Sequence, residues 1–281
     1  TMAVMLYWLA LVLILLATGG MIVFIVRQRK VIFTWSYRVL VAGFFVHTAF
    51  LAHQYAALGT APVLSLKASL GFFAWTVTGA YLLFQLRFRL RALGSFVAPL
   101  AAVLMIVSTS IPGAEIVEVN PLFKSVWLPV HVVTVFAGDG MFAVMFGAAV
   151  MYLLQERQIK RKRFGSLYSR LPSLETLDAI NHHALVIGFP LLTLGMVTGA
   201  IYAQQALGSF WRWDPKEVWS LITWFAYAVL LHERLTVGWR GRRAAIMSIL
   251  CFLLLVFTFV GISLLSSDYH SFESIEGRGL P

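Results

Sequence analysis

The sequence is short of charge and almost without cysteine. Only 12% of its 281 residues are charged, about half of the roughly 25% found in a typical soluble domain. So few charges cannot cover a water-facing surface, and one cysteine cannot form an internal disulfide. A soluble globular domain and a disulfide scaffold are therefore excluded. A hydrophobic content of 60% also excludes a disordered chain, so an all-α polytopic membrane protein remains.

Long apolar runs fill most of the chain. A helix of about 20 apolar residues crosses a bilayer, and eight segments reach or approach this length. They are roughly Ala3–Val26, Tyr37–Leu58, Leu64–Leu86, Ala92–Ile111, Trp127–Leu154, His183–Ala206, Val218–Leu231 and Ala244–Leu265. The seventh is short, but it is long enough if its helix runs from Asp214 to His232. We therefore expect about eight transmembrane helices.

The basic residues separate the two sides of this predicted bundle. Most of the 22 Lys and Arg residues lie in the loops after the first, third, fifth and seventh segments. By the positive-inside rule these loops face the cytoplasm, so both termini are expected on the outer, periplasmic side. The net charge of +10 then reflects topology and contact with membrane lipids rather than binding to nucleic acid.

We expect one integral membrane domain, residues 1–274, without a separate soluble domain. The tail 275–281 contains Ile275-Glu276-Gly277-Arg278, which matches the recognition sequence of factor Xa. We interpret this tail as the remnant of an expression tag and exclude it from functional reasoning.

The predicted topology sorts the seven histidines by depth. His131 and His270 lie at or just beyond the outer ends of their segments, and His232 lies at an inner end. The other four are His47, His53, His182 and His183. Two outward histidines on different helices are typical of the axial ligands of a haem iron. The alternative is a pair of interfacial histidines that bond to lipid headgroups or backbone.

A tryptophan-rich loop lies on the same predicted outer side. Its aromatic residues are Phe210, Trp211, Trp213 and Trp219, with Trp224 further along the helix. They would form a flat apolar surface suited to a porphyrin face, and Arg212 and Lys216 could meet the haem propionates. Two other interpretations are an interfacial aromatic belt and, for Asp214 and Glu217, an N-terminal helix cap with Pro215 as the first helical residue.

The segment Phe210–Trp224 resembles the WWD signature of haem-handling membrane proteins, which extends here over about residues 207–224. Specifically, the chain is similar to the CcsA (ResC) family of the System II pathway of cytochrome c biogenesis. Further similarity lies in Trp127–Val132, Met151–Arg157, Tyr227–His232 and Asp268–Phe272, so the resemblance covers at least residues 87–273.

The resemblance implies a set of roles. His131 and His270 would be axial ligands of haem iron at the outer face, beside Trp211, Trp213, Asp214, Trp219 and Trp224, and His232 would belong to an inner haem site. Haem b would be carried outward with a CcsB (ResB) subunit and presented to the CxxCH segment of apocytochrome c for thioether ligation. The chain would then be a subunit of a membrane holocytochrome c synthase, or haem lyase, in the bacterial inner membrane or the plastid thylakoid.

The chain departs from the family pattern at Leu207, where tryptophan is frequent, and in the loop Gly59-Thr60-Ala61-Pro62, which lacks histidine and asparagine. Cys251, alone within the last segment, is interpreted as a small buried apolar residue rather than a redox partner. The alternative function is a non-catalytic membrane regulator or stability factor of haem synthesis that shares the fold. A b-type electron-transfer subunit or a small-molecule transporter is less well supported.

Overall fold

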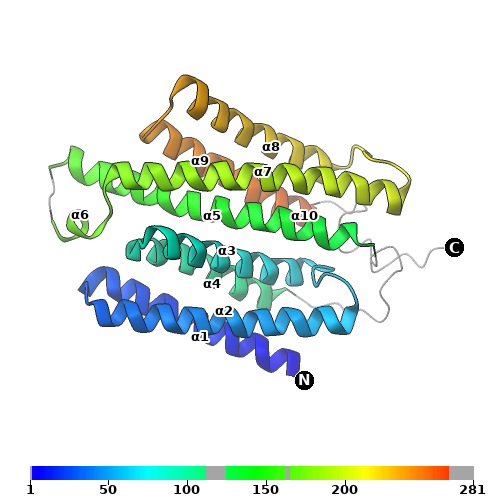
Figure 1. The fold of residues 1–281 in the computed structure, drawn as a ribbon, viewed down its shortest axis with the longest axis horizontal. Helices are drawn as coiled ribbons and strands as arrows, with labels where there is room; N and C mark the ends of the chain where they lie inside the picture. Colours follow the sequence, from blue (N-terminus) through cyan, green and yellow to red (C-terminus); the bar gives the residue numbers. More distant parts are fainter. Residues whose placement is uncertain (1, 112–124, 163–164, 266–281) are drawn as a thin grey trace.

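The computed structural model describes residues 2–111, 125–162 and 165–265, and within these ranges every regular element is helical (Figure 1). The helices are α1 (Met2–Arg27), α2 (Lys30–Leu58), α3 (Leu66–Phe88), α4 (Gly94–Ser110), α5 (Trp127–Lys160), α6 (Ser166–Arg170), α7 (Leu174–Leu207), α8 (Pro215–His232), α9 (Arg242–Val256) and α10 (Ile262–Leu265). The turn Arg91–Leu93 precedes α4, and π-helical turns, Glu233–Val237 and Phe257–Gly261, follow α8 and α9.

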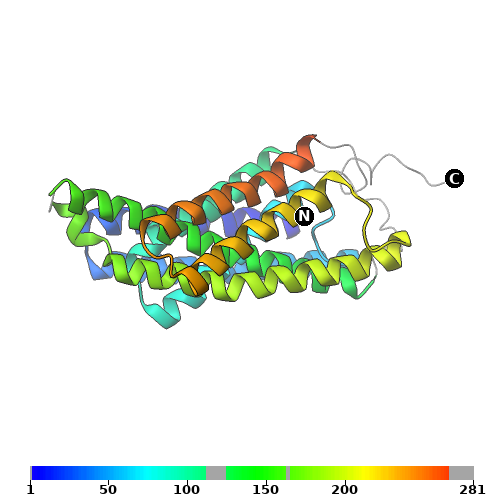
Figure 2. The ribbon, with the colours of Figure 1, turned by 90° about the horizontal axis from the view of Figure 1, so that it is seen from above.

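The long helices run antiparallel in chain order, in an elongated bundle (Figures 1 and 2). The start of α1, the α2–α3 loop and the α7–α8 loop share one end. The basic connections after α1, α3, α5 and α8 share the opposite end. Because a helix satisfies its own backbone hydrogen bonds, this arrangement suits a bilayer, and the predicted all-α polytopic fold is confirmed.

Seven of the described helical segments are long and apolar enough to span a membrane. These are α1, α2, α3, α5, α7, and the combined segments Arg91–Ser110, which contains α4, and Arg242–Leu264. The predicted eighth span corresponds to α8, which has 18 residues and carries Lys216 and Glu217 in its first turn. These charges lower its mean hydropathy, although α8 runs alongside α7 and α9 and contacts both (Figure 1).

Helix α7 begins at Leu174, nine residues before the predicted boundary at His183. The Ser173 hydroxyl caps it by accepting the Thr176 N–H at 3.2 Å. Leu177 and Ile180 of this added part are fully buried. The extension is therefore a packed part of the bundle rather than a surface loop.

Helix α5 lies at the centre, against α3 on one side and α7 on the other. A Cβ atom added at Gly140 would lie 2.7 Å from the carbonyl oxygen of Thr76 in α3. A Cβ atom at Gly138 would lie 3.0 Å from the carbonyl oxygen of Gly188 in α7. Small residues let helix backbones approach this closely in membranes, so these glycines set the spacing of the core.

A buried polar cluster fixes the basic end of α8 against α7 and α9. The Arg234 guanidinium, 3% exposed, makes a bidentate pair with Asp178, with Nη–Oδ distances of 3.2 and 3.1 Å. Arg234 also donates to the Asn181 side chain, which bonds to Ser248 of α9 at 2.9 Å. Asp178 in turn accepts the Gly241 N–H at 2.8 Å. Such a paired and hydrogen-bonded charge can remain inside the bundle.

Gly140→Ala should lower the free energy of unfolding by about 1–3 kcal/mol, because the added methyl group must push α5 away from the Thr76 carbonyl. Gly19→Ala in α1 is the matched control, since its Cβ atom would meet nothing within 4 Å. The control should be neutral or stabilising by up to about 1 kcal/mol. Thermal unfolding in detergent measures both, and equal shifts for the two variants would contradict this account of the core.

Candidate functional site

The tryptophan-rich loop joins two helices through well-defined caps. Gly208 ends α7 in the left-handed conformation (φ +75°) and donates its N–H to the Gln204 carbonyl at 3.0 Å. Asp214 caps α8 by accepting the Glu217 N–H at 2.8 Å, as the sequence predicts. The Glu217 carboxylate reaches back to accept the Arg212 N–H at 2.7 Å. These bonds hold the loop in one shape.

Two indole rings of this loop contact each other, and one of them is largely exposed. Trp213 is 77% exposed, and its φ of +60° is a conformation that costs a non-glycine residue about 1–3 kcal/mol. The half-buried Trp211 ring meets it edge to face, with centroids 5.8 Å apart. Within the described ranges the buried Nε1 of Trp211 has no hydrogen-bond partner. With the exposed Phe210, these rings form a large apolar surface at one end of the molecule.

The other two tryptophans lie on α8. Trp219 meets Phe257 edge to face at 4.9 Å. Trp224 donates its indole N–H to the Thr193 hydroxyl of α7 at 2.9 Å and packs against Phe189, with ring centroids 5.3 Å apart. Trp224 therefore anchors α8 to α7 below the loop.

His131 is half-buried between α5 and α7. Its Nδ1 lies 2.7 Å from the carbonyl oxygen of Gly195, which also accepts the Thr198 hydroxyl at 3.0 Å. Because a carbonyl oxygen only accepts, Nδ1 carries the proton, and the lone pair of the neutral ring resides on Nε2. This tautomer is the one that metal-binding histidines usually adopt when a backbone carbonyl orients them.

His131 and Trp219 come to a similar depth in the bundle. The Trp224–Thr193 bond sets the relative height of α7 and α8. Each helix rises about 1.5 Å per residue. Five residues from Trp224 toward the loop is Trp219 on α8, and five residues from Thr193 toward the loop is position 198 on α7, so these two positions lie at a similar height. Position 198 lies between Gly195 and Gly199, both beside the His131 ring. The second predicted outer histidine, His270, lies outside the described residues.

His232 is exposed at the opposite end of α8, with Nδ1 3.3 Å from the Thr236 hydroxyl. It continues a stripe of exposed residues on α8, spaced by three and four positions: Ile222, Phe225 and Val229. Helix α8 itself lies at the edge of the bundle (Figure 1). His232 is therefore directed away from the protein interior.

The remaining histidines have separate environments. His182 accepts from Arg234 Nε at 3.3 Å, within the polar cluster, and the exposed His183 lies 2.6 Å from the Ala179 carbonyl. His47 is fully buried, and neither ring nitrogen has a partner among the described residues. Cys251 is buried and free, as its sequence context predicts.

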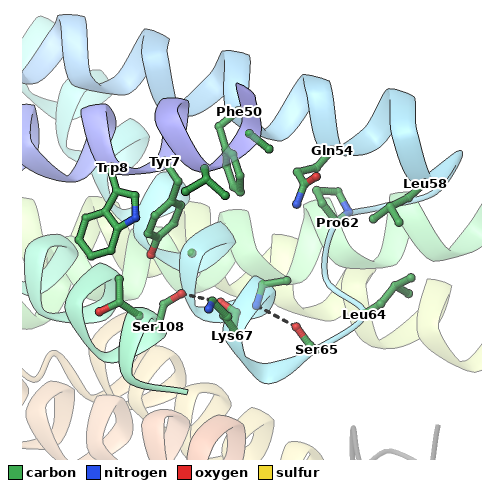
Figure 3. A pocket seen from close by; sticks show the side chains of 15 residues that line it. Tyr7, Trp8, Phe50, Gln54, Leu58, Pro62, Leu64, Ser65, Lys67 and Ser108 are labelled. Carbon is green, nitrogen blue, oxygen red and sulfur yellow. Dashed lines mark hydrogen bonds between the residues drawn. The ribbon is translucent and has the colours of Figure 1, made fainter. Parts of the chain in front are cut away.

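A pocket of about 410 Å³ opens elsewhere, between α1, α2, α3 and α4 (Figure 3). Its lining includes Tyr7, Trp8, Phe50 and Gln54. Tyr7 and Phe50 also contact His47, at ring-centroid distances of 6.2 and 6.0 Å. None of the sequence-predicted site residues lines this pocket.

Sequence reasoning missed the contribution of α7 to the environment of His131. The signal was available in Gly195 and Gly199, because two small residues four positions apart are typical of close helix contacts in membranes. The acceptor itself is a backbone carbonyl and leaves no trace in the sequence.

Comparison with known proteins supports one family. Residues 63–270 match the family model described as cytochrome C assembly protein. The chain is 34% identical to the cytochrome c biogenesis protein CcsA of Chlamydomonas reinhardtii, over 76% of this chain and 61% of that protein. It is 28% identical to CcsA of Guillardia theta, over 95% of this chain and 90% of the relative. For CcsA of Microcystis aeruginosa the identity is 31%, over 80% and 83%.

A solved structure has the same fold. The cytochrome c haem lyase CcmF aligns with a TM-score of 0.64 at 18% identity, covering 94% of this chain and 49% of CcmF. The family match extends over most of the chain and includes the tryptophan-rich loop and His131. The chain therefore belongs to the cytochrome c assembly protein family, membrane proteins with a role in c-type cytochrome maturation.

Proposed function

We propose that this chain carries haem b to the outer face of the membrane and presents it there to apocytochrome c. The observation that carries the proposal is the environment of His131, whose Nδ1 bonds to the Gly195 carbonyl, so that Nε2 has the lone pair that binds iron. His270 would supply the second axial ligand. The chain would act as a subunit of a membrane holocytochrome c synthase.

The tryptophan-rich loop suits the periphery of a haem. The exposed rings of Phe210 and Trp213, with Trp211 edge-on to Trp213, offer an apolar surface at the end of the bundle that also holds the start of α5. Trp219, near the depth of His131, would extend this surface toward the iron. The exposed Arg212 suits a propionate, since guanidinium groups bind carboxylates well. Asp214 contributes indirectly, by capping α8 and holding the loop.

The proposed chemistry is the addition of a thiol of the CxxCH segment across each haem vinyl group. In each addition a C–S and a C–H bond form, while the S–H bond and the C=C π bond break, so no oxidant or reductant is consumed. The thiols come from the apocytochrome, because Cys251 of this chain is buried. The protein's contribution is to orient the haem and exclude competing geometries.

An inner haem site would form at His232 together with a CcsB-type subunit. A histidine on a bilayer-facing helix stripe is costly unless it finds a polar or metal partner. His232 lies on such a stripe with Phe225 and Val229, directed away from this chain's interior. A second subunit packed on this face could supply the other axial ligand, and haem would move from there toward the outer loop.

The distribution of basic residues predicts the orientation of the chain in the membrane. The basic loops after α1, α3, α5 and α8 would face the cytoplasm under the positive-inside rule. The tryptophan-rich loop would then face the periplasm of a bacterium, or the thylakoid lumen of a plastid. This is the side on which c-type cytochromes would receive their haem.

His131→Ala and His270→Ala should each lower the yield of holocytochrome c at least tenfold in cells that express this chain with a CcsB-type subunit. The reason is the loss of an axial ligand to the presented haem. The yield is measured by haem staining of denatured cytochrome, with and without added imidazole, which should partly restore it. His183→Ala is the control, because His183 is exposed at the opposite end of the bundle. Normal yields in both outer variants would refute haem presentation and favour a regulatory role.

A photo-crosslinking residue in place of Val229 should form an adduct with the CcsB-type subunit, because the His232 stripe would be its docking face. The same residue in place of Phe45 is the control, since Phe45 is 66% exposed on α2, at the opposite edge of the bundle. Adducts are detected by immunoblotting of the membranes. Equal adduct yields at the two positions, or none at Val229, would contradict the proposed docking face.

A further inference from the structure

We propose that Gly195 and Gly199 of α7 are positioning residues that hold the His131 imidazole in the orientation that binds haem iron. The inference rests on the proposed function, because it assumes that His131 is an axial ligand. It adds that the orientation of this ligand is set by a different helix from the one that carries it.

Gly199 provides the space that the imidazole occupies. A Cβ atom at position 199 would lie 2.7 Å from both Cε1 and Nδ1 of His131. Real Cβ contacts essentially never come below about 3.0 Å, so an alanine here and the present ring position exclude each other. The ring is a side chain, and it can yield by rotating. Rotation would carry Nδ1 away from the Gly195 carbonyl and redirect Nε2.

Gly195 contributes in two ways. Its carbonyl oxygen, 2.7 Å from Nδ1, fixes the tautomer and the plane of the ring. Its missing side chain lets α5 approach, because a Cβ atom at 195 would collide with Val135, one turn after His131. The two glycines, four residues apart, thus form a groove that receives two residues of α5, also four apart.

Thr198 shares the acceptor with His131. Its hydroxyl, in a side chain that is almost entirely buried, shares its one proton between the Gly195 carbonyl at 3.0 Å and the Leu194 carbonyl at 2.8 Å. The Gly195 carbonyl also accepts the Gly199 N–H of the helix, so Thr198 and His131 are additional donors that weaken each other's bond. The strength of the bond to Nδ1 in turn changes how strongly Nε2 donates to iron.

The competing interpretation is that Gly195 and Gly199 serve only to let the helices pack. Gly188, in the same α5–α7 interface, provides a control for this. At Gly188 a Cβ atom would lie 2.7 Å from Cε1 of Phe142. That ring is stacked on Tyr227 with centroids 3.7 Å apart. Gly188→Ala therefore places an added methyl group as close to α5 as Gly199→Ala does. The site of this disturbance is eleven residues from position 199 and does not touch the His131 ring.

The test uses the full chain purified with its CcsB-type subunit, in a His232→Ala background so that only outer haem is counted. Haem b is titrated in, and the Soret band reports affinity and ligation. Gly199→Ala should weaken binding roughly tenfold, as expected for loss of a group that orients a metal ligand. Added imidazole should restore it, as for His131→Ala. Gly188→Ala should lower the yield of folded protein and leave the affinity and spectrum of the folded fraction unchanged.

Thr198→Val provides a second test. Valine is about the same size as threonine, so this variant removes the hydroxyl without adding bulk. Removing the hydroxyl takes one competing donor away from the Gly195 carbonyl and so strengthens the bond to His131, and the haem midpoint potential should become more negative. Wild-type affinity and spectrum in Gly199→Ala, with loss of haem in His131→Ala, would overturn the positioning role while the proposed function stands. Wild-type haem binding in His131→Ala would instead refute the proposed function itself.

Discussion

The close approach of α5 to α7 is the contact on which both the core and the proposed haem site depend. In a bilayer the hydrophobic effect does not drive helices together, so association depends on close packing and on hydrogen bonds between helices. Glycines at 138, 188, 195 and 199 make this packing possible, and the same approach brings the Gly195 carbonyl within 2.7 Å of His131 Nδ1. The histidine proposed as a haem ligand is thus oriented by the interaction that holds the bundle together.

The helices could be predicted from the sequence because membrane insertion depends on desolvation, which hydropathy and charge placement report directly. The segment predicted for α7 begins nine residues too late because Asp178, Asn181 and His182 interrupt the apolar pattern before His183. Each of them contacts Arg234, more than fifty residues away in the chain. A pattern along one helix cannot predict a partner at that separation.

The candidate site likewise has local features that the sequence predicts and contacts between helices that it does not. The cap of α8 was predictable, because the Asp-Pro-Lys-Glu spacing is a local signal and the bonds of Asp214 and Glu217 are local too. The role of Trp224 was not, since its indole bonds to Thr193 on another helix. The sequence identifies His131 as a candidate by its depth and by the family resemblance, whereas the tautomer that would suit a haem ligand follows from the contact with α7.

The most direct test of haem ligation by His131 is the electron paramagnetic resonance spectrum of the oxidised protein, loaded with haem b and purified with the proposed CcsB-type subunit. The account predicts a low-spin ferric signal of two axial imidazoles at the outer site. In a His232→Ala background this signal should convert to high spin when His131 is replaced by alanine, and return on addition of imidazole. An unchanged low-spin spectrum in that variant would contradict the assignment of His131 as an axial ligand.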